Sequence, residues 1–307
     1  LVALRPGWCR RRARRRRTAV VVRAHPGRQG QDLPLRSDAA GSITVDLGDG
    51  KTTYAGAGCT SITVNNVAPT VAITGAPGSS PEGTAITLHS SVTDPGADTL
   101  SYAWSVIKDG VAYGTAGSVA TLNFTPDDNA SCVVTLSVSD GDGGEGSAST
   151  TIDVTNVAPA ATLGNNGPVD EGSAATISFS GATDPSTPDT TAGLRYAYAC
   201  NGASLASATY ATSDTAASCQ CTYPDGPSDH TVRGRIIDKD GGYSEYTTVV
   251  HVENVAPAPT IHGAPAASPE ATEIALTSTV KDPGADTFTY AWTVTRGSTI
   301  YASGDAP

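Results

Sequence analysis

Aspartates recur in pairs in two successive stretches of this 307-residue chain, each time beside glycine or proline. Calcium takes about six to eight hard oxygen ligands, and carboxylates with asparagine side chains on glycine-rich loops can supply such a shell. We therefore predict calcium sites of low affinity, with dissociation constants of about 0.1 to 1 mM. The candidate ligands are Asp94, Asp98, Asp140, Asp142 and Asn66 in the first stretch, and Asp184, Asp189, Asp238, Asp240 and Asn156 in the second.

The same aspartates also have a simpler interpretation as turn residues. Asp hydrogen-bonds its own backbone in turns, so Asp and Gly are common there without any ion. The run Asp140-Gly141-Asp142-Gly143-Gly144 lacks the later glutamate of an EF-hand loop, so it is not one. Calcium binding and plain turn chemistry both stay open at this point.

Cysteines supply a second chemistry. Cys200 alternates with two tyrosines of one strand pattern, and Cys219 and Cys221 precede a later strand of the same stretch. A disulfide from Cys200 to either Cys219 or Cys221 would join two strands across the core, which suits an oxidising compartment. Cys132 alternates with apolar residues and is expected in the core, whereas Cys9 and Cys59 have no assignable partner.

No pattern of a catalytic centre is present. The five histidines do not recur at equivalent positions, and there is no Gly-x-Ser-x-Gly elbow, phosphate loop or cofactor fingerprint. Carboxylates are abundant, but glycosidase chemistry needs a pair of them that faces a cleft, and no motif in the sequence predicts such a cleft. We expect that this segment is not an enzyme.

The elements that position these residues are organised around a joint, Asn-Val-Ala-Pro, that occurs three times. It begins at Asn66, Asn156 and Asn254, at intervals of 90 and 98 residues, so the chain is an array of domain-sized units. Each joint follows a β-branched run. Proline fixes its own φ and biases the preceding residue toward extended geometry, so each joint is expected to be short and stiff. Stiff joints between like units predict a rod.

The composition favours an all-β fold. Short alternating runs are punctuated by a high content of Gly (33 residues) and Pro (20 residues), and methionine is absent. The triplets Tyr102-Ala103-Trp104, Tyr196-Ala197-Tyr198 and Tyr290-Ala291-Trp292 put two aromatics on one face of a middle strand. An aromatic anchor on that strand is typical of an immunoglobulin-like sandwich. In that fold the loops after the second and sixth strands emerge at the same end, so the aspartate pairs of each unit should meet there.

The predicted domains differ in charge. Residues 1–40 hold 11 arginines against two aspartates, a balance of +9, while the remaining 8 Lys and Arg face 28 Asp and Glu, a balance of −20. We predict that 1–40 is a disordered basic head or a mis-assigned translation start, rather than a nucleic-acid arm or an export signal. The acidic remainder argues against nucleic acid. It divides into a C-terminal fragment of a repeat (41–67), two full repeats (68–157 and 158–255) and the N-terminal part of another (256–307).

Several motifs recur in fixed order in these repeats. They are the Val-Ala-Pro joint, a Glu-Gly turn such as Pro81-Glu82-Gly83, the loop Asp94-Pro95-Gly96-Ala97-Asp98, the aromatic triplet and the hairpin Val138-Ser139-Asp140-Gly141-Asp142-Gly143-Gly144. The series resembles bacterial polycystic-kidney-disease (PKD) domains and neighbouring cadherin-like repeats. The resemblance implies extracellular Ig-like sandwiches in surface or secreted proteins, and in cadherins ions stiffen the domain boundaries.

Two functions fit these observations. The first is a non-catalytic extracellular or cell-surface segment that acts as a spacer or in adhesion, with other domains of the same parent chain as partners, calcium as the one cofactor and no membrane insertion. The second is an ancillary module of a secreted hydrolase that binds a polysaccharide or a surface protein through exposed aromatics. The candidate aromatics are Tyr113, Tyr210, Tyr243, Tyr246 and Tyr301.

Overall fold

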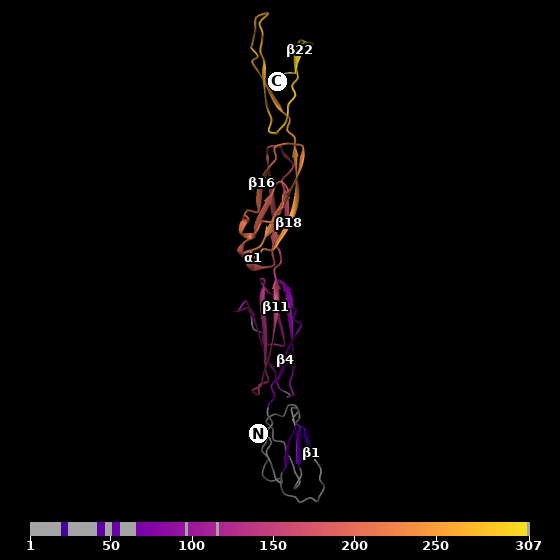
Figure 1. The fold of residues 1–307 in the computed structure, drawn as a ribbon, viewed down its shortest axis with the longest axis vertical. Coiled ribbons are helices and arrows are strands. Elements are labelled where there is room, and N and C mark those ends of the chain that lie inside the picture. The colour runs from indigo at the N-terminus through magenta and orange to yellow at the C-terminus, as the bar shows by residue number, and fades with distance from the viewer. Residues whose placement is uncertain are drawn as a thin grey trace. The chain divides into compact units, whose positions relative to one another are not determined.

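The computed structural model describes residues 66–95, 98–114 and 117–305, together with the backbone of three strands nearer the N-terminus. The chain forms two compact units, Leu1–Thr155 and Asn156–Pro307 (Figure 1). Strands dominate both units. The predicted all-β class is therefore confirmed, and the predicted rod, which concerns the arrangement of the repeats, stays a prediction.

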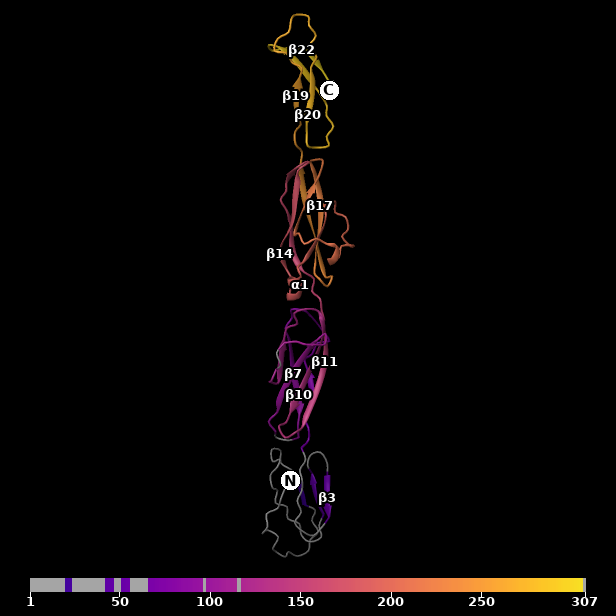
Figure 2. The same cartoon turned by 90° about the vertical axis from the view of Figure 1, so that its left-hand side faces the viewer.

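The first full repeat is a sandwich of two sheets. The sheet β4-β6-β9 packs on the sheet β5-β11-β10-β7-β8, and both are visible in Figures 1 and 2. Apart from the short β5 and β8, the first, second and fourth strands in chain order lie on one sheet and the third, fifth and sixth lie on the other, which is an immunoglobulin-like order. The strands are β4 (Thr70–Thr74), β5 (Ser79–Pro81), β6 (Ile86–Thr93), β7 (Ser101–Lys108), β8 (Val111–Ala112), β9 (Thr121–Phe124), β10 (Ala130–Ser139) and β11 (Glu145–Thr155).

Alternation along β10 builds the core of this sandwich. Cys132, Val134, Leu136 and Val138 point inward and are at most 1% exposed, as expected for every second residue of a strand. Trp104 of β7 lies opposite Leu136 in the register and is buried, and its indole nitrogen donates to the carbonyl of Val119 at 2.9 Å. The predicted aromatic anchor and the predicted core position of Cys132 are both confirmed.

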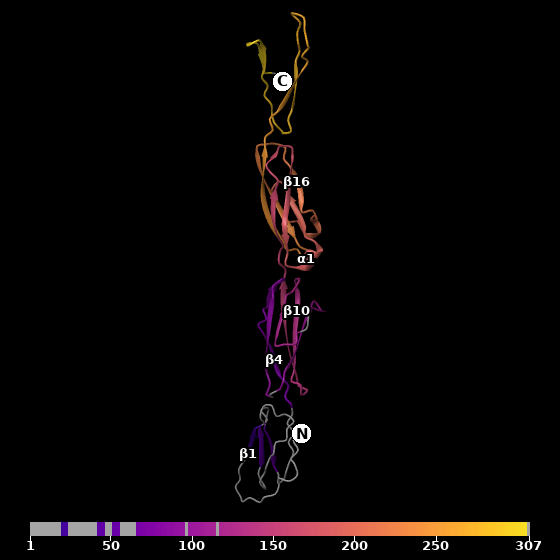
Figure 3. The ribbon, with the colours of Figure 1, turned by 180° about the vertical axis from the view of Figure 1, so that it is seen from behind.

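The second full repeat has the same two-sheet plan. The sheet β12-β14-β16 faces the sheet β13-β18-β17-β15 (Figure 3). Tyr196 and Phe179 pack at its centre with ring centroids 5.4 Å apart. The strands are β12 (Ala160–Asn165), β13 (Val169–Asp170), β14 (Ala174–Thr183), β15 (Arg195–Ala199), β16 (Ser218–Thr222), β17 (Ser228–Ile237) and β18 (Tyr243–Glu253).

A short helix lies in a segment of this repeat that was predicted to be a loop. The segment after Asp184 was expected to be irregular, but α1 (Thr187–Ala192) forms within it, and a short 3-10 turn (Tyr210–Thr212) lies further on. Ser186 caps α1, since its hydroxyl accepts from the amide of Asp189, and Pro188 sits in the first turn where its missing N–H costs nothing. Gly193 ends the helix with a φ of 86°.

Near its two ends the chain forms small sheets of two or three strands. The C-terminal segment holds two antiparallel pairs, β19 (Ala258–His262) with β20 (Thr277–Lys281), and β21 (Trp292–Arg296) with β22 (Thr299–Gly304). Near the N-terminus, β1 (Val20–Arg23) runs parallel to β2 (Ser42–Asp46), which pairs antiparallel with β3 (Lys51–Ala55). β1 lies within the predicted basic head (1–40), whose assignment stays a prediction. The rest of the head, Cys9 and Cys59 lie outside the described residues.

Candidate functional site: acidic clusters beside the joints

The first full repeat gathers three of its predicted ligands at one end. Asp94 and Asp98 follow β6, and Asp140 follows β10, and their carboxylate oxygens all lie within 4.8 Å of one another. The expected meeting of the two loops therefore occurs. Asp142 is exposed and lies outside this 4.8 Å group, although its charge acts on Asp98.

Asp140 is the structural centre of that end. The side-chain amide of Asn66, in the joint, donates to its Oδ2 atom at 2.6 Å, and the backbone amides of Asp142 and Gly144 donate to its Oδ1 atom, each at 2.9 Å. These bonds, the one from Asn66 first, hold the pKa of the 3%-exposed Asp140 carboxyl below its usual value although burial opposes them. A side chain at Gly144 would overlap the carboxylate, so glycine is required there.

Neighbouring charges act on Asp98 within this cluster. Burial, and then the charges of Asp142, Asp94 and Asp140, raise the pKa of Asp98. The Oδ1 atom of Asn66 is buried and has no hydrogen-bond partner among the described residues. The cluster thus combines crowded carboxylates with an unused amide oxygen, which is the kind of donor set that calcium takes.

The second full repeat repeats this frame almost atom for atom. The amide of Asn156 donates to Oδ2 of Asp238 at 2.9 Å, and the amides of Asp240 and Gly242 donate to Oδ1 at 2.9 Å and 2.8 Å. Asp184, Asp189 and Asp238 hold carboxylate oxygens within 4.8 Å of one another. The Oδ1 atom of Asn156 is again buried without a hydrogen-bond partner in the described part of the chain.

Charge compensation differs in the second cluster. The Lys239 ammonium lies 3.2 Å from Oδ1 of the fully buried Asp189 and also pairs with Asp240. Burial raises the pKa of Asp189 while Lys239 opposes that shift, and burial likewise raises the pKa of Asp184. The position equivalent to Lys239 in the first repeat is Gly141, which has no side chain to offer. The second cluster therefore carries its own cation.

A glutamate near this cluster in sequence does not join it. Glu245 instead accepts from Arg235 at 2.6 Å across the β17–β18 pair. That arginine, and Arg233 beside it, hold the pKa of Glu245 below its usual value. Glu245 is the third residue of β18 and lies directly opposite Arg235 in the strand register.

The sequence reasoning missed a third acidic group in the second unit. Glu171, Asp225 and Asp286 hold carboxylate oxygens within 4.8 Å of one another. Glu171 is 1% exposed and accepts from the backbone amides of Gly226 and Val255, each at 2.8 Å, so it binds the third joint through the Val255 amide rather than through an asparagine side chain. The signal in the sequence is the glutamate of the Glu-Gly turns, which turn formation alone does not require.

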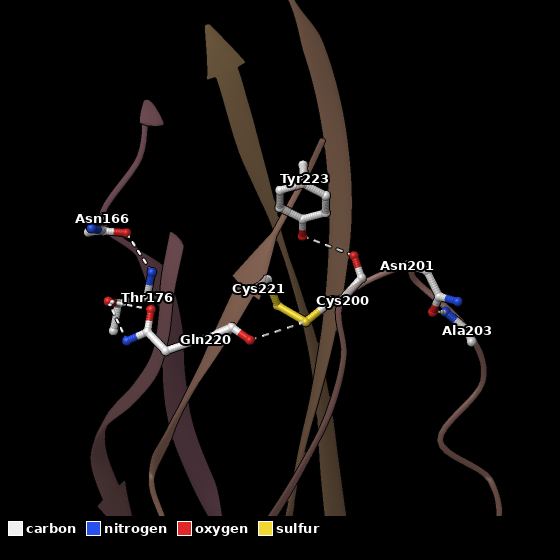
Figure 4. The surroundings of a disulfide bond; sticks show 8 residues. All are labelled: Asn166, Thr176, Cys200, Asn201, Ala203, Gln220, Cys221 and Tyr223. Carbon is white, nitrogen blue, oxygen red and sulfur yellow. Dashed lines mark hydrogen bonds between the residues drawn. A yellow bond between two sulfur atoms is a disulfide. The ribbon is translucent and has the colours of Figure 1, made fainter. Parts of the chain in front are cut away.

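The disulfide prediction is resolved in favour of one pairing. Cys200 and Cys221 form the bridge, with their Cα atoms 5.7 Å apart (Figure 4). The bridge joins β16 to the segment that follows β15, and so connects the two sheets of the second sandwich. Cys219 is a thiol.

The five candidate aromatics divide into two groups. Tyr113, Tyr210 and Tyr246 are half-buried and use their hydroxyls within the fold, so they serve structure. Tyr243 is 51% exposed with the Arg235 guanidinium 3.9 Å from its ring centroid, and Tyr301 is 77% exposed. Only these two of the five present a large surface.

The comparisons with known proteins are distant. No family model and no curated protein matches the sequence. Among solved structures, the fibronectin(III)-like modules of Clostridium thermocellum CbhA are 15% identical over 60% of this chain and 94% of theirs, with a TM-score of 0.23. The amphioxus IgVJ-C2 molecule is 14% identical over 56% of this chain and 99% of its own, with a TM-score of 0.31.

A third similar structure is the N-terminal four Ig domains of Dscam1 isoform 6.9. It is 12% identical over 67% of this chain and 51% of its own, with a TM-score of 0.33. These scores are too low to add to what the strand order of each sandwich shows, namely an immunoglobulin-like fold. Among the described residues, no helix is long and apolar enough to cross a membrane.

Proposed function

We propose that the chain is a non-catalytic spacer or adhesion segment of a surface or secreted protein, made of tandem PKD-like repeats. The observation that carries this proposal is the hydrogen bond from the asparagine of each of the first two joints to a buried hairpin aspartate, Asn66 to Asp140 and Asn156 to Asp238. The bond fixes the segment that leads into each sandwich to the sandwich itself. Such attachment is what a spacer needs and what a catalytic role does not explain.

The strength of this attachment follows from its charge and burial. A hydrogen bond to an ionised group contributes about 1.5 to 3 kcal/mol, and more is lost when a buried carboxylate is left without its donor. Asp140 and Asp238 are 3% and 0% exposed, so water cannot readily replace the asparagine. The joints are therefore held by bonds that cost much to break.

Calcium is part of the proposal for the first full repeat. Asp94, Asp98 and Asp140 are crowded, Asp98 has a raised pKa, and the Asn66 Oδ1 atom is available beside them. An ion at this end would draw both loops and the joint together. Titration calorimetry of the full chain with calcium should give binding in the range of about 0.1 to 1 mM.

Pulsed electron paramagnetic resonance tests the spacer role directly. Spin labels carried by non-natural amino acids at the exposed positions Ser147 and Thr247 report the spread of distances between the two sandwiches. We expect one narrow distribution that broadens in Asn156→Ala. An equally broad distribution in both proteins would mean that the joint is a flexible tether, and the spacer proposal would fail.

The second candidate function, an ancillary binding module, is favoured by the exposure of Tyr243 and Tyr301. Aromatic rings at a surface can stack on sugar rings or on a partner's side chains. Co-sedimentation with insoluble polysaccharides, compared between the natural chain and the variants Tyr243→Ala and Tyr301→Ala, distinguishes this function. Binding that is lost in either variant supports it, and absence of binding supports the spacer role alone.

A further inference from the structure

Three cysteines form a cluster at the middle of the second sandwich. The Sγ atoms of Cys200, Cys219 and Cys221 lie within 4.8 Å of one another, although only Cys200 and Cys221 are bonded. The arrangement follows from strand geometry. Cys219 and Cys221 are two residues apart on β16 and so share one face, while Gln220 between them is exposed and pairs with Thr176 (Figure 4).

Cys200 stands opposite both of these cysteines. Its carbonyl accepts from the hydroxyl of Tyr223 at 3.0 Å, and its Sγ atom lies 3.9 Å from the carbonyl oxygen of Gln220, the residue between the other two cysteines. Both Cys200 and Cys219 pack against the buried cluster that contains Cys221. The Sγ atom of Cys200 is therefore close enough to bond to the Sγ atom of either Cys219 or Cys221.

We propose that the Cys219 thiol exchanges with the neighbouring disulfide, so that the bridge alternates between Cys200–Cys221 and Cys200–Cys219. The Cys219 thiolate, after giving its proton to solvent, attacks Sγ of Cys200. The Cys200–Cys221 bond breaks as the Cys200–Cys219 bond forms, and Cys221 leaves as a thiolate that takes up a proton. One disulfide and one thiol exist before and after, so no oxidant or reductant is consumed.

The exchange changes which thiol faces outward. Cys219 is partly exposed, whereas Cys221 is 1% exposed. The Cys200–Cys221 isomer therefore offers a thiol to alkylating agents or to small thiol and disulfide compounds, and the Cys200–Cys219 isomer hides it. The bridge moves by two residues along one strand, so the side chains of β16 keep their faces.

The rate should depend steeply on pH. Burial raises the pKa of the Cys219 thiol, so little thiolate is present near neutrality. Because the thiolate is the attacking species, exchange should accelerate about tenfold per pH unit until that raised pKa is reached.

Thiol mapping of the full chain tests the proposal. Protein equilibrated at about pH 9 is quenched in acid, unfolded and alkylated with N-ethylmaleimide at about pH 5, where exchange is slow. Tandem mass spectrometry then shows which cysteine carries the label. We expect label on both Cys219 and Cys221, with the Cys221 share growing during equilibration. Label confined to Cys219 at every time would overturn the proposal.

Two variants keep the result interpretable. Cys221→Ser should form a Cys200–Cys219 bridge, which non-reducing peptide mapping detects, and Cys219→Ser should keep Cys200–Cys221 and lose all time dependence. If Cys221→Ser has a native circular dichroism spectrum yet leaves Cys200 and Cys219 as thiols, the proposal is wrong. If that variant does not fold, the time course of the natural chain decides.

Discussion

The acidic ends of the two full repeats have the same hydrogen-bond frame but different charge compensation. In both, a joint asparagine and two hairpin amides surround one buried aspartate. The first cluster leaves its carboxylates crowded, and Asp98 responds with a raised pKa. The second places the Lys239 ammonium against Asp189. We propose that this shared arrangement is completed by an external cation in the first repeat and by a lysine in the second, depending on a single hairpin position.

The largest effect is expected from removing the buried aspartate. Asp140→Ala leaves the Asn66 amide and two backbone amides without their acceptor, so the free energy of unfolding of the first sandwich should fall by about 2 to 4 kcal/mol. Urea unfolding followed by Trp104 fluorescence measures it, since Trp104 is buried in that sandwich. The matched control is the exposed Asp142→Ala, which should change the value by less than about 0.5 kcal/mol. Equal effects of the two changes would show that the hydrogen bonds to Asp140 do not stabilise the first sandwich.

The joint asparagines should come next. Asn66→Ala and Asn156→Ala each remove one bond to a buried carboxylate, at a cost of about 1.5 to 3 kcal/mol. Because Lys239 stabilises the second cluster, Asn156→Ala should be the milder of the two. Hydrogen exchange of the β10–β11 and β17–β18 amides, read by mass spectrometry, reports each sandwich separately. A greater loss of protection in the second sandwich would contradict the comparison.

Replacing the internal cation should convert the second cluster into a copy of the first. Lys239→Gly, which introduces the residue found at position 141, should destabilise the calcium-free second sandwich by about 1 kcal/mol. It should also create a new calcium response there. Lys239→Arg keeps the charge and is the control, so it should create no such response. A Lys239→Gly protein that ignores calcium would show that the lysine does not stand in for an ion.

The smallest effect is a pH dependence of the first cluster without calcium. The folded-state pKa of Asp98 lies above its ordinary value of 3.8. The native state therefore holds the proton more tightly, and this contribution to stability is present below pH 3.8 and is lost as the pH rises through the raised pKa. Asp98→Asn should flatten that slope in chelator. Urea midpoints between about pH 3 and pH 6 give the comparison, and an unchanged slope would exclude Asp98 as its source.

Much of this account could be read from the sequence because it depends on local patterns. Period-two alternation located the buried residues of β10, and the Asn-Val-Ala-Pro joints marked the starts of both sandwiches. The convergence of Asp94, Asp98 and Asp140 followed from strand order alone.

The rest depends on contacts between residues that no local pattern connects. The pairing of Lys239 with Asp189 needs α1, whose cap at Ser186 looked like an ordinary loop residue in the sequence. Glu171 meets Asp225 and Asp286 although the three lie on separate segments, and Glu245 turns to a cross-strand arginine. Packing and the position of the nearest opposite charge determine these contact partners. Both are known only once the chain is folded.

A calcium titration followed by amide NMR on the full chain tests the central claim most directly, because it observes both clusters in one sample. We predict that the amides of Asp142 and Gly144 shift and saturate at about millimolar calcium, while those of Asp240 and Gly242 stay in place. Equal shifts at both hairpins would contradict the role given to Lys239. No shift at either would show that the aspartates are turn residues and that hydrogen bonds alone hold the joints.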